Sequence, residues 1–312
     1  MKNLYTLLAL LITAILTSPA QITGALAGNN TQNTANIVVS IKPLHSLVAN
    51  ITKGISTPAL ILNTPASPHT YNLKPSDATT LAHARVIFWI GPQVEAFLQK
   101  PLTSLASSAT IVSFVEPEDD HEEHKDEKHA DEKHDDEKHS EHEHEGADPH
   151  IWLNPVDAKE MVEKIAATLA KADPANAAEY QTNLLATLER LDALDRELAA
   201  KLSDIAPILV FHNAYTHLAE RYNIKIAGVV VHNPELTPGA GHIRKIRQQI
   251  KTTNAACLFA EPQFSSKIVD TIARNTKVKT GTLDPLASNL EAGPEHYFTM
   301  MRAIANSLTN CR

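Results

Sequence analysis

Four side chains of the kinds that bind transition metals lie in segments predicted to join strands to helices. His69 lies in ASPHTYNLKPSD, and His150 lies in DPHIWLNP. His212 follows the apolar run ILVF, and Asp284 follows VKTGTL. Three neutral imidazoles with one carboxylate or one water form a tetrahedral set that suits zinc. A single loop histidine is weak evidence, because most are solvated or structural, so the prediction depends on a fold that brings these residues together.

The apolar pattern predicts strands and helices that alternate along the chain. Predicted strands cover residues 36–44, 57–63, 86–90, 110–114, 208–211, 225–231, 257–261 and 278–283. Predicted helices cover residues 45–54, a segment that starts near 76, 93–105, 155–171, 174–206, 213–222, 241–253, 265–275 and 296–309. This alternation implies mostly parallel sheets. Ligands of such folds collect at loops after the carboxyl ends of strands.

One predicted helix is much longer than the others. It covers about 30 residues, and one apolar stripe runs along it at three- and four-residue spacing. The stripe consists of Leu184, Leu188, Leu191, Leu194 and Leu198. Globular helices average about 11–12 residues, so this one is expected to be a rigid spacer between two lobes. We therefore expect an α/β fold, with two β/α lobes of mostly parallel strands joined by a long rigid α-helix.

The expected divisions of the chain begin with a secretory signal peptide. Lys2 is followed by an apolar run over residues 4–16 and by small residues at 25–27, a pattern typical of a cleavable signal. The alternative is a buried N-terminal helix. We expect a signal peptide at 1–27, an N-terminal lobe at 28–172, a linking helix at 173–206 and a C-terminal lobe at 207–312. No cysteine follows the apolar run and no later stretch has membrane length, so the sequence predicts a soluble periplasmic protein that is not lipidated.

The chain has two cysteines, Cys257 and Cys311. In an oxidising compartment an even count favours a disulfide, which would tie the C-terminal segment to the strand near Leu258. Two buried free thiols are the alternative. The chain has no CxxC motif, which argues against a cysteine zinc site.

An acidic, histidine-rich insertion lies within the N-terminal lobe, at residues 116–147. Residues 116–145 carry a net charge of −12, against −8 for the whole chain, so the remainder of the chain has no strong charge bias. No nucleic-acid-binding face is therefore expected. The insertion lacks periodic apolar residues and is predicted to be disordered. Its histidines are His121, His124, His129, His134, His139, His142 and His144. We interpret them as weak auxiliary zinc ligands that collect zinc; a solvated spacer is the alternative.

Five stretches, in chain order, carry a resemblance to a known family: SPHTYNLKPSD, ADPHIWLNP, FHNAY, FAEPQF and TLDPL. With the histidine-rich insertion and the long helix, they resemble the ZnuA-type zinc-binding proteins of ABC importers, in the cluster A-I solute-binding family. The resemblance covers essentially the whole mature chain. It implies that metal binds in the cleft between two lobes, through His69 and His150 on the N-terminal side and His212 on the C-terminal side.

The fourth ligand stays open at this point. Asp284 matches a position that supplies a carboxylate in many members of the wider family, and a water is the alternative. In some zinc proteins of the family, a glutamate just before the first histidine takes the place of the fourth ligand. This sequence has Pro68 at that position, so this option is absent. Manganese-type relatives have a glutamate at the position of His212, and imidazole in its place favours zinc.

Other histidines carry no matching motif and are interpreted as structural or solvated. They are His45, His83, His217, His232, His242 and His296, of which His232 is the most suspect because it follows a strand. Glu261 is expected to orient a ligand imidazole.

The expected function is capture of Zn²⁺ in the periplasm and delivery to an inner-membrane ABC permease, by a monomer that does no catalysis. A zinc hydrolase is disfavoured, because HEEHK and HEHEG in the insertion miss the HExxH spacing. A periplasmic zinc buffer or metallochaperone without a permease, and a manganese-type binding protein, are the alternatives.

Overall fold

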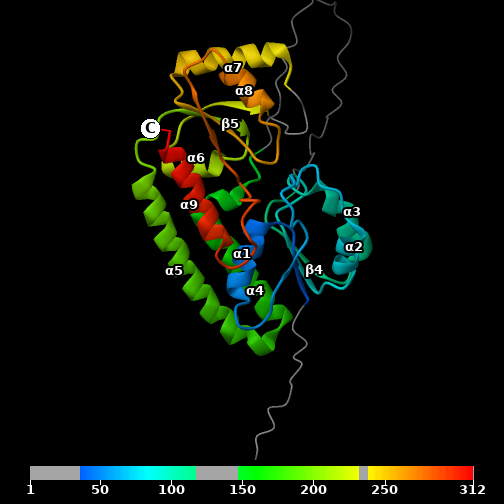
Figure 1. Ribbon diagram of the computed structural model, residues 1–312. Helices are drawn as coiled ribbons and strands as arrows, with labels where there is room; N and C mark the ends of the chain where they lie inside the picture. Colours follow the sequence, from blue (N-terminus) through cyan, green and yellow to red (C-terminus); the bar gives the residue numbers. More distant parts are fainter. Residues whose placement is uncertain (1–35, 117–146, 232–237, 312) are drawn as a thin grey trace, which may run out of the picture. The chain divides into compact units, whose positions relative to one another are not determined.

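The computed structural model describes residues 36–116, 147–231 and 238–311 (Figure 1). The predicted signal peptide, the seven histidines of the insertion and His232 lie outside the described residues. The described chain contains two four-stranded sheets in which every strand pair is parallel. The predicted α/β fold with two parallel sheets is therefore confirmed.

Both sheets have the same strand order relative to the chain. The first is β2-β1-β3-β4, and the second is β6-β5-β7-β8. The strands are β1 (Ile37–Val39), β2 (Ala59–Leu60), β3 (Val86–Trp89), β4 (Thr110–Ser113), β5 (Ile208–His212), β6 (Ile226–Val231), β7 (Cys257–Ala260) and β8 (Lys279–Thr282). The central strands β1, β3 and β5 are buried along their whole length, as expected for apolar strands covered on both faces.

Helices connect the strands within each sheet. In the first half these are α1 (Lys42–Ile51), α2 (Pro75–Ala82) and α3 (Gln99–Leu105), and in the second half α6 (Thr216–Tyr222), α7 (Ala240–Thr253) and α8 (Lys267–Ala273). Helix α2 starts at Pro75 rather than at Ser76, and the Asp77 carboxylate accepts the backbone N–H of Lys74 at 3.0 Å. The cap is therefore made by the third helical residue reaching back, and not by a side chain before the helix.

The connection between the two sheets consists of α4 (Pro155–Ala172) and α5 (Ala177–Lys201). Asn154 caps α4 by accepting the N–H of Val156 at 3.0 Å. The predicted long helix is confirmed, but it is shorter than expected, because Pro174–Asn176 form a 3₁₀ turn before it. Helix α5 packs along α4 and also contacts α1, so it is part of the core and not an isolated spacer (Figure 1).

The C-terminal helix α9 (His296–Thr309) returns to the first half of the chain and packs against α1 and α5. A disulfide joins Cys257, at the start of β7, to Cys311 just after α9, so this prediction is confirmed. The link closes a loop with a sequence separation of 54 residues, which stabilises the fold by about 4 kcal/mol in the chain-entropy account. The residue bounds of the two predicted lobes stay a prediction.

Candidate metal centre

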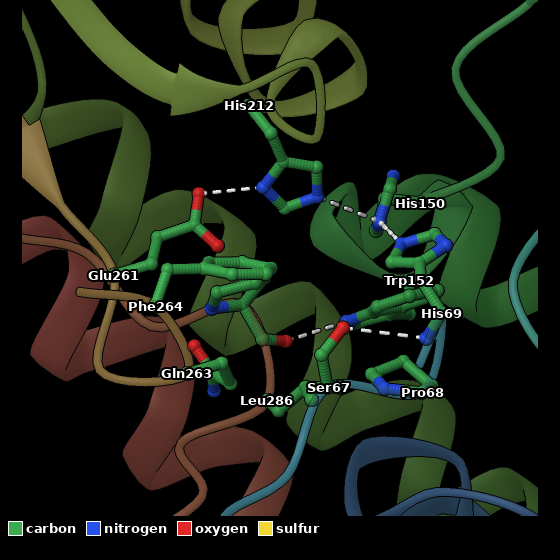
Figure 2. Close-up of a pocket in the computed structure, with 11 residues that line it drawn as sticks. Ser67, Pro68, His69, His150, Trp152, His212, Glu261, Gln263, Phe264 and Leu286 are labelled. Carbon is green, nitrogen blue, oxygen red and sulfur yellow. Dashed lines mark hydrogen bonds and ion pairs between the residues drawn. The ribbon is translucent and has the colours of Figure 1, made fainter. Parts of the chain in front are cut away.

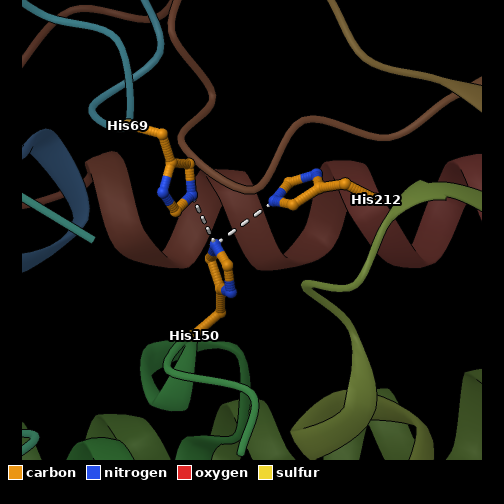
Figure 3. Close-up of side chains that lie close together, drawn as sticks. All are labelled: His69, His150 and His212. Carbon is orange, nitrogen blue, oxygen red and sulfur yellow. Dashed lines mark hydrogen bonds between the residues drawn. The ribbon is translucent and has the colours of Figure 1, made fainter. Parts of the chain in front are cut away.

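Three histidines from distant parts of the chain converge on one point (Figure 3). His69 lies between β2 and α2, and His150 directly precedes the 3₁₀ turn Ile151–Leu153 that leads into α4. His212 is the last residue of β5. His150 and His212 are buried, at 3 % and 4 % exposed, and His69 is partly buried. Of the residues that the structure describes, these form the group of side chains whose ligand atoms could hold a metal ion.

The spacing of the three imidazoles matches zinc coordination. The Nε2 atom of His150 lies 3.4 Å from Nε2 of His69 and 3.3 Å from Nε2 of His212. Two nitrogens bound to one Zn²⁺ at about 2.0–2.1 Å, with tetrahedral angles, are about 3.3–3.4 Å apart. The two separations from His150 are therefore those that a tetrahedral zinc ion requires, and all three ligand atoms lie within 4.8 Å of one another.

Carboxylates fix the tautomers of two of the histidines, and Figure 2 shows the contact of His212 with Glu261. The Nδ1–H of His212 donates to Oε1 of Glu261 at 2.7 Å, the orienting contact expected for Glu261 from the sequence. The Nδ1–H of His150 donates to Oδ1 of Asp148, also at 2.7 Å. Because each Nδ1 carries the proton, each Nε2 presents its lone pair to the common point.

Burial disfavours the charged form of two of these imidazoles. Burial of His69, together with the neighbouring rings of His150 and His212, lowers its pKa to about 3. Burial also lowers the pKa of His150 from its ordinary value. For Asp148, burial raises the pKa, but the hydrogen bonds from His150 outweigh it and bring the pKa to about 2. At neutral pH the imidazoles of His69 and His150 are thus uncharged, next to an ionised Asp148 carboxylate.

The walls around the histidines are largely apolar, and the space is small. The cavity measures about 10 Å³, close to what a single water-sized sphere needs. Its lining includes Trp152, Phe264, Pro285 and Leu286 (Figure 2). The indole N–H of Trp152 donates to the carbonyl of Pro285 at 2.8 Å, which joins the loop of His150 to the loop of Asp284. A site of this size suits one ion and excludes a larger substrate.

Asp284 is not part of the three-histidine group. Its Oδ1 atom accepts from Nε2 of Gln263 at 2.7 Å and from the backbone N–H of Leu286 at 3.0 Å. Its Oδ2 atom accepts from the backbone N–H and the hydroxyl of Ser288, at 2.8 and 2.9 Å. Both oxygens are therefore occupied by protein donors, and a role for Asp284 as fourth ligand stays a prediction.

Two residues near the site were not found from the sequence. Asp148 holds His150 and also accepts the N–H of Thr216 at the start of α6, at 2.8 Å. His217 donates through Nε2 to the Asp148 carbonyl at 2.8 Å, and its Nδ1 pairs with Asp157 at 3.0 Å. The only available signal for Asp148 was its place two residues before His150 in DPH. The pairing of His217 has no local signal, because its partners lie about 60–70 residues earlier.

The remaining described histidines lie outside the group and bond to backbone carbonyls. The acceptors are Pro58 for His45, Thr79 for His83, Val230 for His242, and Leu286 and Glu291 for His296. These contacts agree with their interpretation as structural histidines.

The chain matches a known family over nearly all of its described length. Residues 37–311 match the family ZnuA, described as zinc-uptake complex component A periplasmic. The high-affinity zinc uptake system protein ZnuA of Brucella abortus (strain 2308) is 44 % identical over 303 residues, which cover 88 % of this chain and 91 % of that protein.

Solved structures give the same relationship. A crystal structure of ZnuA superimposes with a TM-score of 0.71 at 26 % identity, over 89 % of this chain and 99 % of that chain. A deletion mutant of ZnuA with zinc bound superimposes with a TM-score of 0.72 at 25 % identity, over 89 % of this chain and 98 % of that chain.

Proposed function

The chain belongs to the ZnuA family of zinc-uptake complex components, and from this premise we propose that it captures Zn²⁺ and delivers it to an ABC permease in the inner membrane. His69, His150 and His212 hold the ion in this proposal. One observation carries it above the others: the Nε2 separations of 3.3 and 3.4 Å are those of nitrogens that share one tetrahedral zinc ion.

The geometry favours holding the metal over using it in catalysis. A hydrolytic zinc site needs an open coordination position with a general base beside it. The carboxylates next to the histidines, Asp148 and Glu261, each hold an imidazole N–H at 2.7 Å and thus serve to orient ligands. The cavity of about 10 Å³ leaves no room for a substrate. Zn²⁺ is then cargo, and the protein is a binding component that does no chemistry.

The place of action follows from the same premise. The family is periplasmic by description, and we propose that residues 1–27 are a cleaved, non-lipidated signal and that the mature chain acts as a monomer. Among the described residues, no helix combines the length and the apolar character needed to cross a membrane. A zinc buffer or metallochaperone is the second candidate. Measuring zinc uptake at low zinc in cells that lack this protein distinguishes a transport component from a buffer. Loss of a transport component abolishes the uptake, and loss of a buffer does not.

Single-residue variants test the site. His150→Ala is expected to weaken the tight zinc site by more than about 100-fold, because even loss of a partner that only orients a ligand costs about 10–100-fold. His83→Ala is the matched control, since His83 is exposed and its imidazole bonds to the carbonyl of Thr79 in α2. Competition titration with a zinc chelator gives both affinities. Unchanged affinity in His150→Ala would show that the tight site lies elsewhere.

A further inference from the structure

Gln263 lies at the wall of the zinc cavity, and Asp284 lies behind it. Gln263 is one of the residues that line the cavity, whereas Asp284 is not. The two side chains are joined by the 2.7 Å hydrogen bond from Nε2 of Gln263 to Oδ1 of Asp284. The amide of Gln263 is therefore part of the cavity wall, whereas the Asp284 carboxylate that it binds is not.

The hydrogen bond also fixes which way the Gln263 amide points. A carboxylate accepts from the NH₂ group only, so the amide oxygen has to face away from Asp284. In Figure 2 the amide oxygen lies toward Phe264 and the amide nitrogen lies on the opposite side. Oε1 is buried, and no described residue donates a hydrogen bond to it. The residue that lines the cavity at this point is thus a neutral amide, and the Asp284 carboxylate that it binds is not part of the lining.

We propose that Gln263 is a specificity-determining residue, which keeps the Asp284 carboxylate out of the metal shell and so preserves a three-histidine site selective for zinc. The inference rests on the proposed function. Imidazole ligands suit zinc, whereas carboxylate and water ligands suit manganese and magnesium. A carboxylate that entered the shell would add a hard, charged oxygen and shift the relative affinity toward Mn²⁺. Gln263 opposes this by binding Oδ1 of Asp284 with its NH₂ group, and of the described side chains that donate to Asp284 it is the one that also lines the cavity.

Gln263→Leu tests the proposal, because leucine fills the volume but cannot bind Asp284. The ratio of the Zn²⁺ and Mn²⁺ dissociation constants is measured by competition titration on the full chain. In Gln263→Leu the ratio should move toward Mn²⁺ by about tenfold or more, the size of effect typical for residues around a metal site. Gln248→Leu is the matched control, since Gln248 is exposed on α7 and remote in sequence from the site.

A double variant identifies the cause. In Gln263→Leu with Asp284→Asn, the carboxylate is absent and the ratio should return to that of the parent. A ratio in Gln263→Leu within about twofold of the parent overturns the proposal, and so does a shift that persists in the double variant. If the leucine variant does not fold, Gln263→Asn replaces it, because this change shortens the side chain and keeps it polar. The same shift of the ratio toward Mn²⁺ is expected. A parent chain without a single tight zinc site would instead contradict the proposed function.

Discussion

Glu261 is a buried carboxylate that orients one of the three histidines. It is 3 % exposed and accepts the Nδ1–H of His212 at 2.7 Å. An ionised acceptor strengthens this hydrogen bond and increases the electron density at Nε2, where the metal binds. Burying a carboxylate is costly unless it is paired, so its presence here points to a function in the site and not to stability.

Glu261→Gln is expected to weaken zinc binding by about tenfold, the lower end of the range for such partners, because the amide oxygen still accepts from His212 but without charge. Glu189→Gln, on the exposed surface of α5, is the control and should bind zinc as the parent does. Chelator competition at constant pH measures both. Equal affinity for Glu261→Gln and the parent would mean that the carboxylate charge contributes nothing to the site.

At this scale the sequence predicts residue types better than contacts. His69, His150 and His212 could be found because each lies in a loop or at a strand end where ligands of α/β folds collect. The hydrogen bond from Gln263 to the Asp284 carboxylate could not be predicted, since it depends on how the loop after β7 meets the loop after β8. Only tertiary structure fixes such a contact.

Helix α6 is tied to the loop of His150 by side chains from both sides. Asp148 accepts the N–H of Thr216, and His217 of the same helix bonds to the Asp148 carbonyl and to Asp157 of α4. Since α6 follows His212, these contacts connect the segments that carry two of the three histidines. The hydrogen bond with Asp157 raises the pKa of His217 to about 9, although burial acts in the opposite direction.

The metal-free protein should therefore lose stability between pH 7 and pH 9. The folded pKa of His217 lies above its unfolded value of 6.5, so its contribution is complete below the unfolded pKa and is lost as pH rises through about 9. Glu95 also loses its stabilising proton with rising pH, because burial raises its pKa to about 7, but this occurs mainly below the window. Urea unfolding of the chelated protein at each pH measures the loss.

His217→Gln provides the comparison, because the variant cannot gain or lose the proton. Its free energy of unfolding should change less between pH 7 and pH 9 than that of the parent, whereas exposed His83→Gln should follow the parent. Identical pH profiles for the parent and His217→Gln would exclude His217 as the source of the slope.

The elements themselves follow from the sequence, but their packing does not. The sequence pattern predicted all eight strands of the described chain, and most clearly the fully buried β1, β3 and β5, since a strand buried on both faces needs an apolar run. The packing of α9 against α1 was not predicted, because an amphipathic helix shows which face is buried but not which partner buries it. Helix α5 illustrates the same limit: its leucine stripe fits a spacer and a packed helix equally well.

For the described part of the chain, the two sheets share one hydrophobic core. The cluster includes Val39 and Phe88 of the first sheet, Val210 and Phe259 of the second, and Leu191 of α5 between them. Polar contacts reinforce it, as Lys42 of α1 donates to the carbonyls of Ser288 and Leu290 at 2.7 and 2.9 Å. The described part of the chain therefore provides a continuous scaffold for the three-histidine group.

Deletion of residues 118–145 should accordingly leave one tight zinc site with unchanged affinity and remove the additional weak sites. Within the described residues, the three histidines and their carboxylate partners Asp148 and Glu261 form a complete group. The segment itself has seven histidines and a strongly acidic charge, which suit loose binding of several ions. Isothermal titration calorimetry of the parent and the deletion variant, with a competing chelator for the tight site, measures both the tight and the weak zinc sites.

A second variant separates the imidazoles from the charge. With all seven histidines changed to glutamine the acidic residues remain, so weak sites that survive in this variant depend on carboxylates, and weak sites that disappear depend on imidazole. We expect them to disappear at neutral pH, because carboxylates alone bind zinc weakly in competition with water. Loss of the tight site on deletion would contradict the division between the insertion and the buried centre, since the scaffold around His150 would then need the segment to form.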